Sequence, residues 1–333
     1  MRRTRSDEVG RWSSEELLLR AAWFYYKDEL TQDEIAKRLS LSRASVGRLL
    51  DRARRVGLVS IQLNAEHLDA FALSAELRRV FHLSEALVVP DHDKEPADHH
   101  AVNARVGLGG AQFLSTHLRP GASLGVGWGE TVSRVIAATS FGAVGPVHMV
   151  TLTGGVDGYL PTILSSKAEA ADGDQVTTAA VIPAPIHASS PELAAALREE
   201  PTIQQVLKHA CEVDLAVVGV GTPTLDATIV QLGYFTEDDV RTLAEHHVVG
   251  DILGEFFDAN GQVADLPLHD RRIGIELADL TKIPKVVGVA GGAHKAEAIL
   301  GALRGGFLDV LVTNEIAATR LLELEASRGE PGD

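Results

Sequence analysis

Apolar and polar positions near the start of the chain follow a helical period. From Trp12 to Tyr26, apolar side chains recur three or four residues apart, which predicts one amphipathic helix. Thr31 follows this segment and Glu34 comes three residues later, so the two side chains can form a capping box at the start of a second helix. This second helix is short, and we expect it to end near Leu39.

A third helix is predicted from Arg43 to Val56, after a tight turn that begins at Ser40. Ser42 is its expected N-terminal cap, and Gly57 is expected to end it. The alternating segment from Leu58 to Leu63 then predicts a strand, which we interpret as a wing.

Two helices joined by a tight turn, the second rich in arginine and small polar residues, are typical of a helix-turn-helix. A helix that enters the major groove needs leading side chains that reach base edges and cations along its flank that meet phosphates. The residues that we expect at the groove are Ser42, Arg43, Ser45 and Arg48, with Gln32 and Arg52 nearer the DNA backbone. An ordinary solvated helical face is the alternative interpretation.

The charge distribution favours DNA binding over that alternative. Residues 1–62 hold 13 basic and 9 acidic side chains, whereas the rest of the chain holds 18 basic and 37 acidic ones. The formal net charge of the 333 residues is −15, so the molecule as a whole is no general binder of polyanions. We therefore expect a DNA-binding domain over residues 1–63 and a large acidic domain over residues 64–333.

Past a polar, helical bridge, the pattern changes to short apolar runs that end in glycine and precede helices. Such runs predict strands that are buried on both faces of a mainly parallel sheet. The expected strands are 122–126, 148–153, 215–221, 285–292 and 309–313, and the expected helices include 131–138 and 314–323. The acidic part is therefore predicted to be a doubly wound α/β domain, and the chain as a whole an α/β protein.

Three glycine-rich turns follow these predicted strands. Sheets of this kind bind ligands beyond the carboxyl ends of their strands, where glycines admit a close ligand and helix N-termini attract anions. The candidate ligand-binding residues in these turns are Gly129, Thr131, Gly154, Gly155, His294 and Lys295. Two alternatives stay open, because glycines also serve tight turns without any ligand and because a histidine and a lysine at a helix start can be a surface pair.

Asp251 is a further candidate, since a carboxylate ahead of an apolar segment can accept hydrogen bonds from sugar hydroxyls. Asp258 lies in a turn-like segment and can instead serve its own backbone. Lys167 can in principle form a Schiff base with an aldehyde sugar, although most lysines are solvated charges.

Several classes of protein are not supported by the sequence. Cys211 is the only cysteine, and no spacing of the 13 histidines predicts a metal site, so we expect neither a metal nor a cofactor. The polar start has no signal-peptide core, and no apolar run approaches the roughly 20 residues that span a bilayer. We expect a soluble cytoplasmic protein.

The segments now described resemble the SorC family of bacterial transcriptional regulators, over nearly the whole chain. The resemblance is carried by T-Q-D-E-I-A-K-R-L-S-L-S-R-A-S-V-G-R-L-L (31–50), G-V-G-W-G-E-T-V (125–132), G-D-I-L-G-E-F-F-D-A-N-G (250–261) and G-V-A-G-G-A-H-K-A-E-A-I-L-G-A-L-R-G-G-F-L-D-V-L-V-T (288–313). It implies a winged helix-turn-helix that binds operator DNA, followed by an effector domain related in fold to phosphosugar isomerases and deaminases. It further implies a homotetramer whose affinity for the operator of a carbohydrate operon changes with a sugar or sugar-phosphate effector.

The resemblance also implies roles for single residues. Trp128, Gly129, Glu130 and Thr131 match the phosphate loop of the family, Lys295 matches a ligand-contacting lysine, and Asp251 matches an acid of the effector pocket. Glu130 departs from members with a small hydroxyl residue in that turn, and its carboxylate would repel a nearby phosphate dianion.

The alternative function is an enzyme of the isomerase or deaminase type, with Asp251 and His294 as an acid and base pair. We favour the regulator, because an enzyme needs no arginine-rich helix ahead of its catalytic domain and because a shared fold does not transfer an activity.

Overall fold

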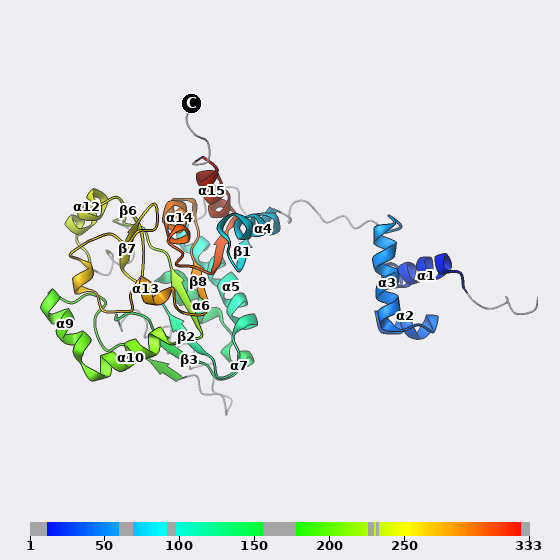
Figure 1. The fold of residues 1–333 in the computed structure, drawn as a ribbon, viewed down its shortest axis with the longest axis horizontal. Coiled ribbons are helices and arrows are strands. Elements are labelled where there is room, and N and C mark those ends of the chain that lie inside the picture. Colours follow the sequence, from blue (N-terminus) through cyan, green and yellow to red (C-terminus); the bar gives the residue numbers. More distant parts are fainter. Residues whose placement is uncertain are drawn as a thin grey trace, which may run out of the picture. The chain divides into compact units, whose positions relative to one another are not determined.

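A computed structural model of the chain describes residues 12–59, 69–91, 98–155, 178–225, 230 and 233–327. The chain divides into two compact units, residues 1–64 and 65–333, and each has a core of its own (Figure 1). Within the described ranges, no helix has both the length and the apolar character that crossing a membrane requires.

Between residues 12 and 59, the N-terminal unit contains three helices, α1 (Ser14–Tyr26), α2 (Gln32–Leu39) and α3 (Arg43–Arg55). One apolar face of each helix contributes to the core of this unit. The buried side chains of that core are Leu18, Ala21, Ala22, Ile35, Ala36, Val46, Leu50 and Ala53. Burial of these faces holds the three short helices together, because helices of this length are marginal in isolation.

The ends of these helices follow from local hydrogen bonds. The capping box predicted for Thr31 and Glu34 is present at the start of α2. Gly57 follows α3 with a φ of +74°, a conformation that glycine adopts without strain. The predicted wing strand is only partly described, since positions 58 and 59 form a bend and residues 60–63 lie outside the described ranges.

In its described part, the C-terminal unit is built on a sheet of seven strands, and every neighbouring pair in it runs parallel. In spatial order the strands are β1 (Glu85–Val89), β9 (Val310–Asn314), β8 (Val286–Val289), β5 (Leu215–Gly219), β2 (Ser123–Val126), β3 (His148–Thr151) and β4 (Thr178–Ala180). From β2, the next strands in sequence, β3 and β4, are added towards one edge of the sheet. From β5, the later strands β8 and β9 are added in the opposite direction, towards β1 at the other edge. The point of reversal lies between β2 and β5.

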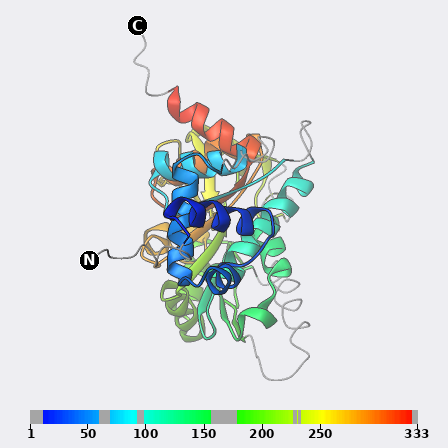
Figure 2. The ribbon, with the colours of Figure 1, turned by 90° about the vertical axis from the view of Figure 1, so that its right-hand side faces the viewer.

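Helices cover both faces of this sheet, as predicted (Figure 1, Figure 2). One face packs against α5 (His99–His117), α6 (Glu130–Ala138) and α7 (Phe141–Val144), and the other mainly against α4 (Asp69–Phe81), α10 (Pro201–Cys211), α14 (Ala296–Arg304) and α15 (Glu315–Ala326). Alternate side chains of one strand serve the two faces: Val310 and Val312 of β9 join the first layer, and Leu311 joins the second.

Further elements complete the C-terminal unit. They include the antiparallel hairpin of β6 (Val248–Ile252) and β7 (Glu255–Asp258), the helices α9 (Pro191–Glu199), α12 (Glu237–Glu245) and α13 (Leu277–Leu280), and the 3-10 turns η2 (His269–Arg271) and η3 (Ala293–Lys295). The hairpin turn is tight, with positive φ at Leu253 (+57°) and Gly254 (+74°). Asp258 serves its own backbone at the far end of β7, because its Oδ1 accepts hydrogen bonds from the N–H groups of Asn260 and Gln262.

Candidate nucleic-acid interface and ligand site

The start of α3 presents the residues predicted to reach DNA. Ser42 is the N-cap of this helix, and its Oγ accepts a hydrogen bond from the Ser45 N–H at 3.1 Å. The two hydroxyls lie 2.9 Å apart, and the Arg48 guanidinium donates to the Ser45 Oγ at 3.0 Å. The leading turn of α3 therefore carries an ordered row of polar side chains.

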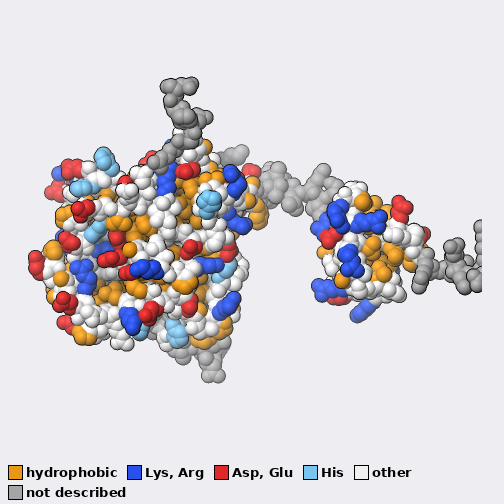
Figure 3. Space-filling view, viewed as in Figure 1, with side chains coloured by type: hydrophobic (Ala, Val, Ile, Leu, Met, Phe, Trp, Pro, Cys, Tyr) orange, Lys and Arg blue, Asp and Glu red, His pale blue; other side chains and the backbone are white. Residues whose placement is uncertain are grey.

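Most cations of this unit project from exposed positions, and Lys and Arg side chains gather on part of the face seen in Figure 3. Arg43 makes a long ion pair, 3.6 Å to Asp33, and Arg52 donates to the Ser14 Oγ at 3.2 Å. Gln32 is half-buried at the start of α2. None of these contacts neutralises the arginines strongly, so their charge is available to a phosphate backbone.

Most of the predicted ligand residues of the C-terminal unit lie near the ends of β2, β5 and β8, whereas Gly154 and Gly155 follow β3. The reversal of strand order between β2 and β5 is the place where open α/β sheets bind ligands. At this place the Gly127 N–H donates to the Val217 carbonyl at 2.8 Å, and a Cβ on Gly127 would lie 3.0 Å from the same oxygen. The loop that leaves β2 is thus held close to the end of β5.

The glycine turn after β2 leads directly into α6. Gly129 has a φ of +114° and is the N-cap of α6 without any side-chain cap. Apart from its chain neighbours, no atom of the described residues lies within 4 Å of the place where a Cβ on Gly129 would stand. Half-buried Trp128 packs edge-on against Tyr234, with ring centroids 6.4 Å apart, and forms one wall beside the turn. Thr131 is buried, and its hydroxyl donates to the Asn103 side chain at 3.0 Å.

Glu130 does not place a free carboxylate over this turn. Its carboxylate accepts hydrogen bonds from Asn103 at 2.9 Å and from Arg134 at 2.6 and 2.9 Å, and it lies 2.8 Å from the His100 Nδ1. Burial raises the pKa of Glu130, but the hydrogen bonds from His100, Arg134 and Asn103 outweigh burial and bring the pKa below its usual value. The carboxylate is ionised and tied to α5 and Arg134, which reduces the repulsion expected for an anion at the turn.

Asp251 lies in β6 and is buried, with 8% of its surface exposed. Its Oδ2 accepts the Gly254 N–H at 3.0 Å, and its backbone pairs with Gly221 at the end of β5. A Cβ on Gly221 would overlap the Asp251 carboxylate, so a larger residue at this position would displace that side chain. Burial raises the pKa of Asp251 to about 6, against the opposing effects of the Gly254 hydrogen bond and of the charges of Lys295 and Arg272.

Lys295 ends η3, directly after the glycine turn that follows β8. Its Nζ donates to the Val220 carbonyl at 3.1 Å, so the ammonium stands at the end of β5 next to the strand pairing of Asp251. The structure therefore brings Lys295 and Asp251 together, although they lie 44 positions apart in sequence. His294 is exposed, and its ring folds back towards Gly292.

The glycine turn after β3 differs from the other two. The Gly154 N–H donates to the Ile273 carbonyl and the Gly155 N–H to the Ala184 carbonyl, at 2.9 and 2.8 Å. A Cβ on Gly154 would overlap the carbonyl oxygen of Pro185. These two glycines permit close packing of three chain segments, and their N–H groups are already used by the protein.

A buried ion pair beside the site was not predicted from the sequence. The Arg272 guanidinium contacts Glu255 at 3.1 Å and donates to the Ile275 carbonyl at 2.8 Å, while the Glu255 carboxylate also accepts the Leu277 N–H at 2.8 Å. This pair fixes β7 against the segment before α13. No sequence pattern distinguishes it, and Lys167, the candidate for a Schiff base, lies outside the described residues.

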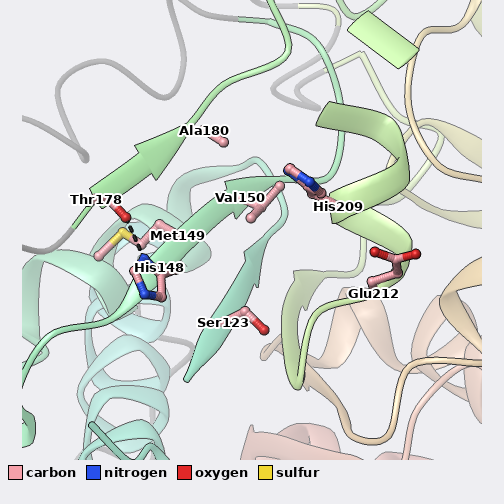
Figure 4. Close-up of a pocket in the computed structure, with 8 residues that line it drawn as sticks. All are labelled: Ser123, His148, Met149, Val150, Thr178, Ala180, His209 and Glu212. Atoms are coloured by element: carbon pink, nitrogen blue, oxygen red, sulfur yellow. Dashed lines mark hydrogen bonds between the residues drawn. The ribbon is translucent and has the colours of Figure 1, made fainter. Parts of the chain in front are cut away.

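A shallow hollow of about 340 Å³ lies at the opposite edge of the sheet, where β2, β3 and β4 begin (Figure 4). Its lining residues are Ser123, His148, Met149, Val150, Thr178, Ala180, His209 and Glu212. The His148 Nδ1 lies 2.6 Å from the Thr178 Oγ1. The hollow shares no residue with the predicted ligand site.

In the N-terminal unit, α2 and α3 form a helix-turn-helix whose second helix, α3, is rich in exposed arginines. The C-terminal unit is an α/β domain with polar residues at its strand ends. This combination defines the class of ligand-responsive DNA-binding regulators. Comparison with known proteins places the chain within that class. Residues 65–323 match the family described as "Putative sugar-binding domain". The chain belongs to the SorC family of sugar-binding transcriptional regulators.

Similar proteins extend over both units. The transcriptional regulator LsrR of Enterobacter sp. (strain 638) is 40% identical over 316 residues, which is 94% of each chain. The full-length sorbitol operon regulator SorC of Klebsiella pneumoniae is 26% identical, with a TM-score of 0.68 over 94% of this chain and all of that one. The sugar-binding domain of a transcriptional repressor from Vibrio fischeri is 30% identical, with a TM-score of 0.68 over 77% of this chain and 99% of that one.

Proposed function

We propose that the chain binds operator DNA through the start of α3 and that a sugar or sugar phosphate in the C-terminal unit changes this affinity. Ser42, Arg43, Ser45 and Arg48 contact base edges in the major groove, and Gln32 and Arg52 contact the DNA backbone. The observation that supports this assignment is the exposed polar row at the start of α3. Its arginines make only weak contacts with acidic groups of the described residues, so their charges are not neutralised there.

The effector site lies over the ends of β2, β5 and β8. Lys295 and the N-terminus of α6, with Trp128, Gly129, Glu130 and Thr131, attract the anionic or oxygen-rich part of the ligand, and Asp251 accepts hydrogen bonds from its hydroxyls. Gly154 and Gly155 shape the neighbouring wall by packing, and exposed His294 stands at the rim. The meeting of Lys295 and Asp251 at the reversal of strand order supports this placement.

Effector and operator are coupled through an assembly of several copies, which we propose to be a homotetramer in the cytoplasm. Paired recognition helices fit two half-sites about one DNA turn apart, so a small displacement of one disturbs the match. The effector must bind one arrangement better than the other, and coupling of about 1–3 kcal/mol is typical.

The test uses the full chain and DNA fragments selected from a random pool by that chain. Operator affinity is measured with and without D-ribose 5-phosphate, D-glucose 6-phosphate, D-fructose 6-phosphate and their unphosphorylated sugars. We expect at least one sugar phosphate to change the affinity about 5- to 150-fold. No selected sequence, or no response to any of these compounds, would contradict the proposal.

A matched pair of variants locates the response. Lys295→Met should abolish the effector response and leave operator affinity unchanged, because the lysine charge acts only at the strand ends. Lys208→Met removes the same charge from an exposed position of α10 and should leave both properties unchanged. An intact response in Lys295→Met would remove this lysine from the site.

We further propose that the domain binds its ligand without converting it. The similar proteins over the whole chain are transcriptional regulators, and the two groups considered for acid and base chemistry differ in exposure, Asp251 being buried and His294 exposed. Incubation with the same sugar phosphates, followed by NMR of the mixture, should show no new species. Conversion that Asp251→Asn abolishes would instead support the isomerase or deaminase alternative.

A further inference from the structure

One wall of the proposed effector site carries a histidine that neither the family resemblance nor the sequence pattern singled out. The strand-like segment 186–188 pairs with residues 271–273, through hydrogen bonds of 2.8 Å from Ala188 to Arg271 and 2.9 Å from Ile273 to Ile186. Ile186 and Ala188 are buried on one side of this segment. Successive side chains of an extended chain point to opposite sides, so His187 faces the other way.

On that side His187 lies against the turn that holds Asp251. A Cβ on Gly254 would come within 3.2 Å of the His187 Cε1, and the N–H of this same glycine donates to the Asp251 Oδ2. The ring of Phe235 closes another side, with ring centroids 4.9 Å apart. His187 and Asp251 therefore share one glycine neighbour at the carboxyl ends of the strands.

The ring nitrogens of His187 are shielded from solvent, and neither has a hydrogen-bond partner in the described part of the chain. Buried polar atoms are nearly always paired, because an unpaired one costs about 1–3 kcal/mol. His269 gives the contrast within the same domain, since its Nε2 accepts the Phe256 N–H at 2.9 Å. Among the described residues, none supplies the hydrogen-bond partner that the buried ring nitrogens of His187 require.

The surroundings of His187 also fix its charge. Burial is the largest cause that lowers the pKa of His187, and together with the nearby charges of Arg272, Arg271 and His269, and against the opposite effect of Asp239, it brings this pKa to about 3. The ring is therefore neutral near pH 7, with one nitrogen that donates and one that accepts. A hydroxyl group has the same two capacities, whereas a phosphate dianion offers acceptors only and prefers a cation.

We propose that His187 is an effector-binding residue that hydrogen-bonds a hydroxyl group of the sugar, on the side of the site lined by Asp251 and Gly254. The proposal rests on the proposed function and adds to it the orientation of the ligand in the site. The hydroxyl-bearing end lies between His187 and Asp251, and any phosphate lies away from them, towards Lys295 and the N-terminus of α6.

The test measures ligand affinity of the full chain by calorimetry for three variants. His187→Phe keeps the ring shape but removes both nitrogens, His187→Gln keeps one donor and one acceptor, and His269→Phe is the matched control. The probes are inorganic phosphate and the best of D-ribose 5-phosphate, D-glucose 6-phosphate and D-fructose 6-phosphate for the wild type. We expect His187→Phe to bind the sugar phosphate about 10- to 100-fold more weakly and inorganic phosphate as the wild type does.

The controls separate a binding role from a structural one. His187→Gln should recover part of the affinity, and unliganded His187→Phe should unfold at the wild-type temperature or above it, because it buries no unpaired nitrogen. His269→Phe should unfold at a lower temperature and keep the wild-type affinity, because it loses only the Phe256 hydrogen bond.

Each contrary result has a distinct meaning. Unchanged sugar-phosphate affinity in His187→Phe, or a loss of stability as large as that of His269→Phe, would overturn the role of His187, with a bridging water as its partner instead. An equal loss for inorganic phosphate would overturn the direction given to the ligand. No binding of any sugar phosphate to the wild type would overturn the proposed effector class, and this proposal with it.

Discussion

Asp251 shows how a single residue of the site opposes folding. Its pKa is 3.8 in an unstructured chain and about 6 in the folded protein, so the folded state binds the proton more tightly. The stability gained from this proton is complete below pH 3.8 and is lost as the pH rises through about 6. The ionised, buried carboxylate of Asp251 therefore lowers the stability of the unliganded protein at neutral pH.

Asp251→Asn is expected to stabilise the unliganded chain at pH 8 by up to about 3 kcal/mol, since one pKa unit corresponds to about 1.4 kcal/mol. The amide oxygen can still accept the Gly254 N–H, and no buried charge remains. Urea unfolding of both proteins at pH 8 and pH 4 measures this, and the difference should shrink at pH 4. A variant that is less stable than the wild type at pH 8 would show that the carboxylate is needed for folding.

The arginines of α3 lead to a prediction at the same scale. Arg43→Ala and Arg48→Ala should each weaken binding to a selected operator by about 1–3 kcal/mol and leave effector affinity unchanged. Arg320→Ala removes the same charge from an exposed position of α15 and serves as the control. Titrating labelled operator with each variant gives the comparison. Wild-type operator affinity in Arg48→Ala would exclude this residue from the groove.

Residues of the site differ in how far the sequence reveals them. Lys295 and Asp251 follow or flank glycine turns, so their place at the strand ends could be predicted from pattern and resemblance. The side chain of Glu130 could not be placed, because its partners His100 and Asn103 lie about 30 positions earlier on another helix. His187 has no local signal, since an unpaired nitrogen is a property of the packed structure alone.

Among elements, those with strong local signals were predicted best. The Thr31 capping box, the Ser42 cap and the glycine after α3 are set by neighbours in sequence, and these helix ends were confirmed within one or two residues. The antiparallel hairpin of β6 and β7 was not predicted. Its segment 250–261 has apolar residues that resemble a buried strand, and only its pairing across the Leu253–Gly254 turn shows the hairpin.

The turn after β3 provides a prediction about an element. Gly154→Ala should destabilise the C-terminal unit by about 3 kcal/mol, because the added Cβ meets two backbone carbonyl oxygens that cannot move aside as side chains do. Gly142→Ala, in α7, meets no atom within 4 Å and should be neutral or stabilising by up to about 1 kcal/mol. Thermal unfolding of both variants measures this. Equal stability of the two would show that the turn after β3 can open without cost.

At the scale of the whole molecule, the two units carry net charges of opposite sign. The excess of basic residues lies in the first 62 positions, and the rest of the chain is strongly acidic. An acidic surface repels DNA, so we expect contact with the duplex to be confined to the N-terminal unit. In the proposed effector site Lys295 supplies a cation beside Asp251, and hydrogen bonds from Asn103 and Arg134 hold the Glu130 carboxylate.

This difference in charge predicts that operator affinity and sugar-phosphate affinity respond differently to salt. If two N-terminal units bind one operator with about three phosphate contacts each, six contacts imply that affinity falls about 1000-fold between 50 and 200 mM salt. Sugar-phosphate affinity should change far less over this range, because it depends on one lysine and a helix N-terminus at a partly shielded site. Fluorescence titrations of the full chain in a salt series measure both. The Arg48→Ala variant should keep most of the salt slope if Arg48 reads a base, and should lose about two of the six contacts, one from each unit, if Arg48 binds a phosphate. The same series therefore also decides the role of Arg48.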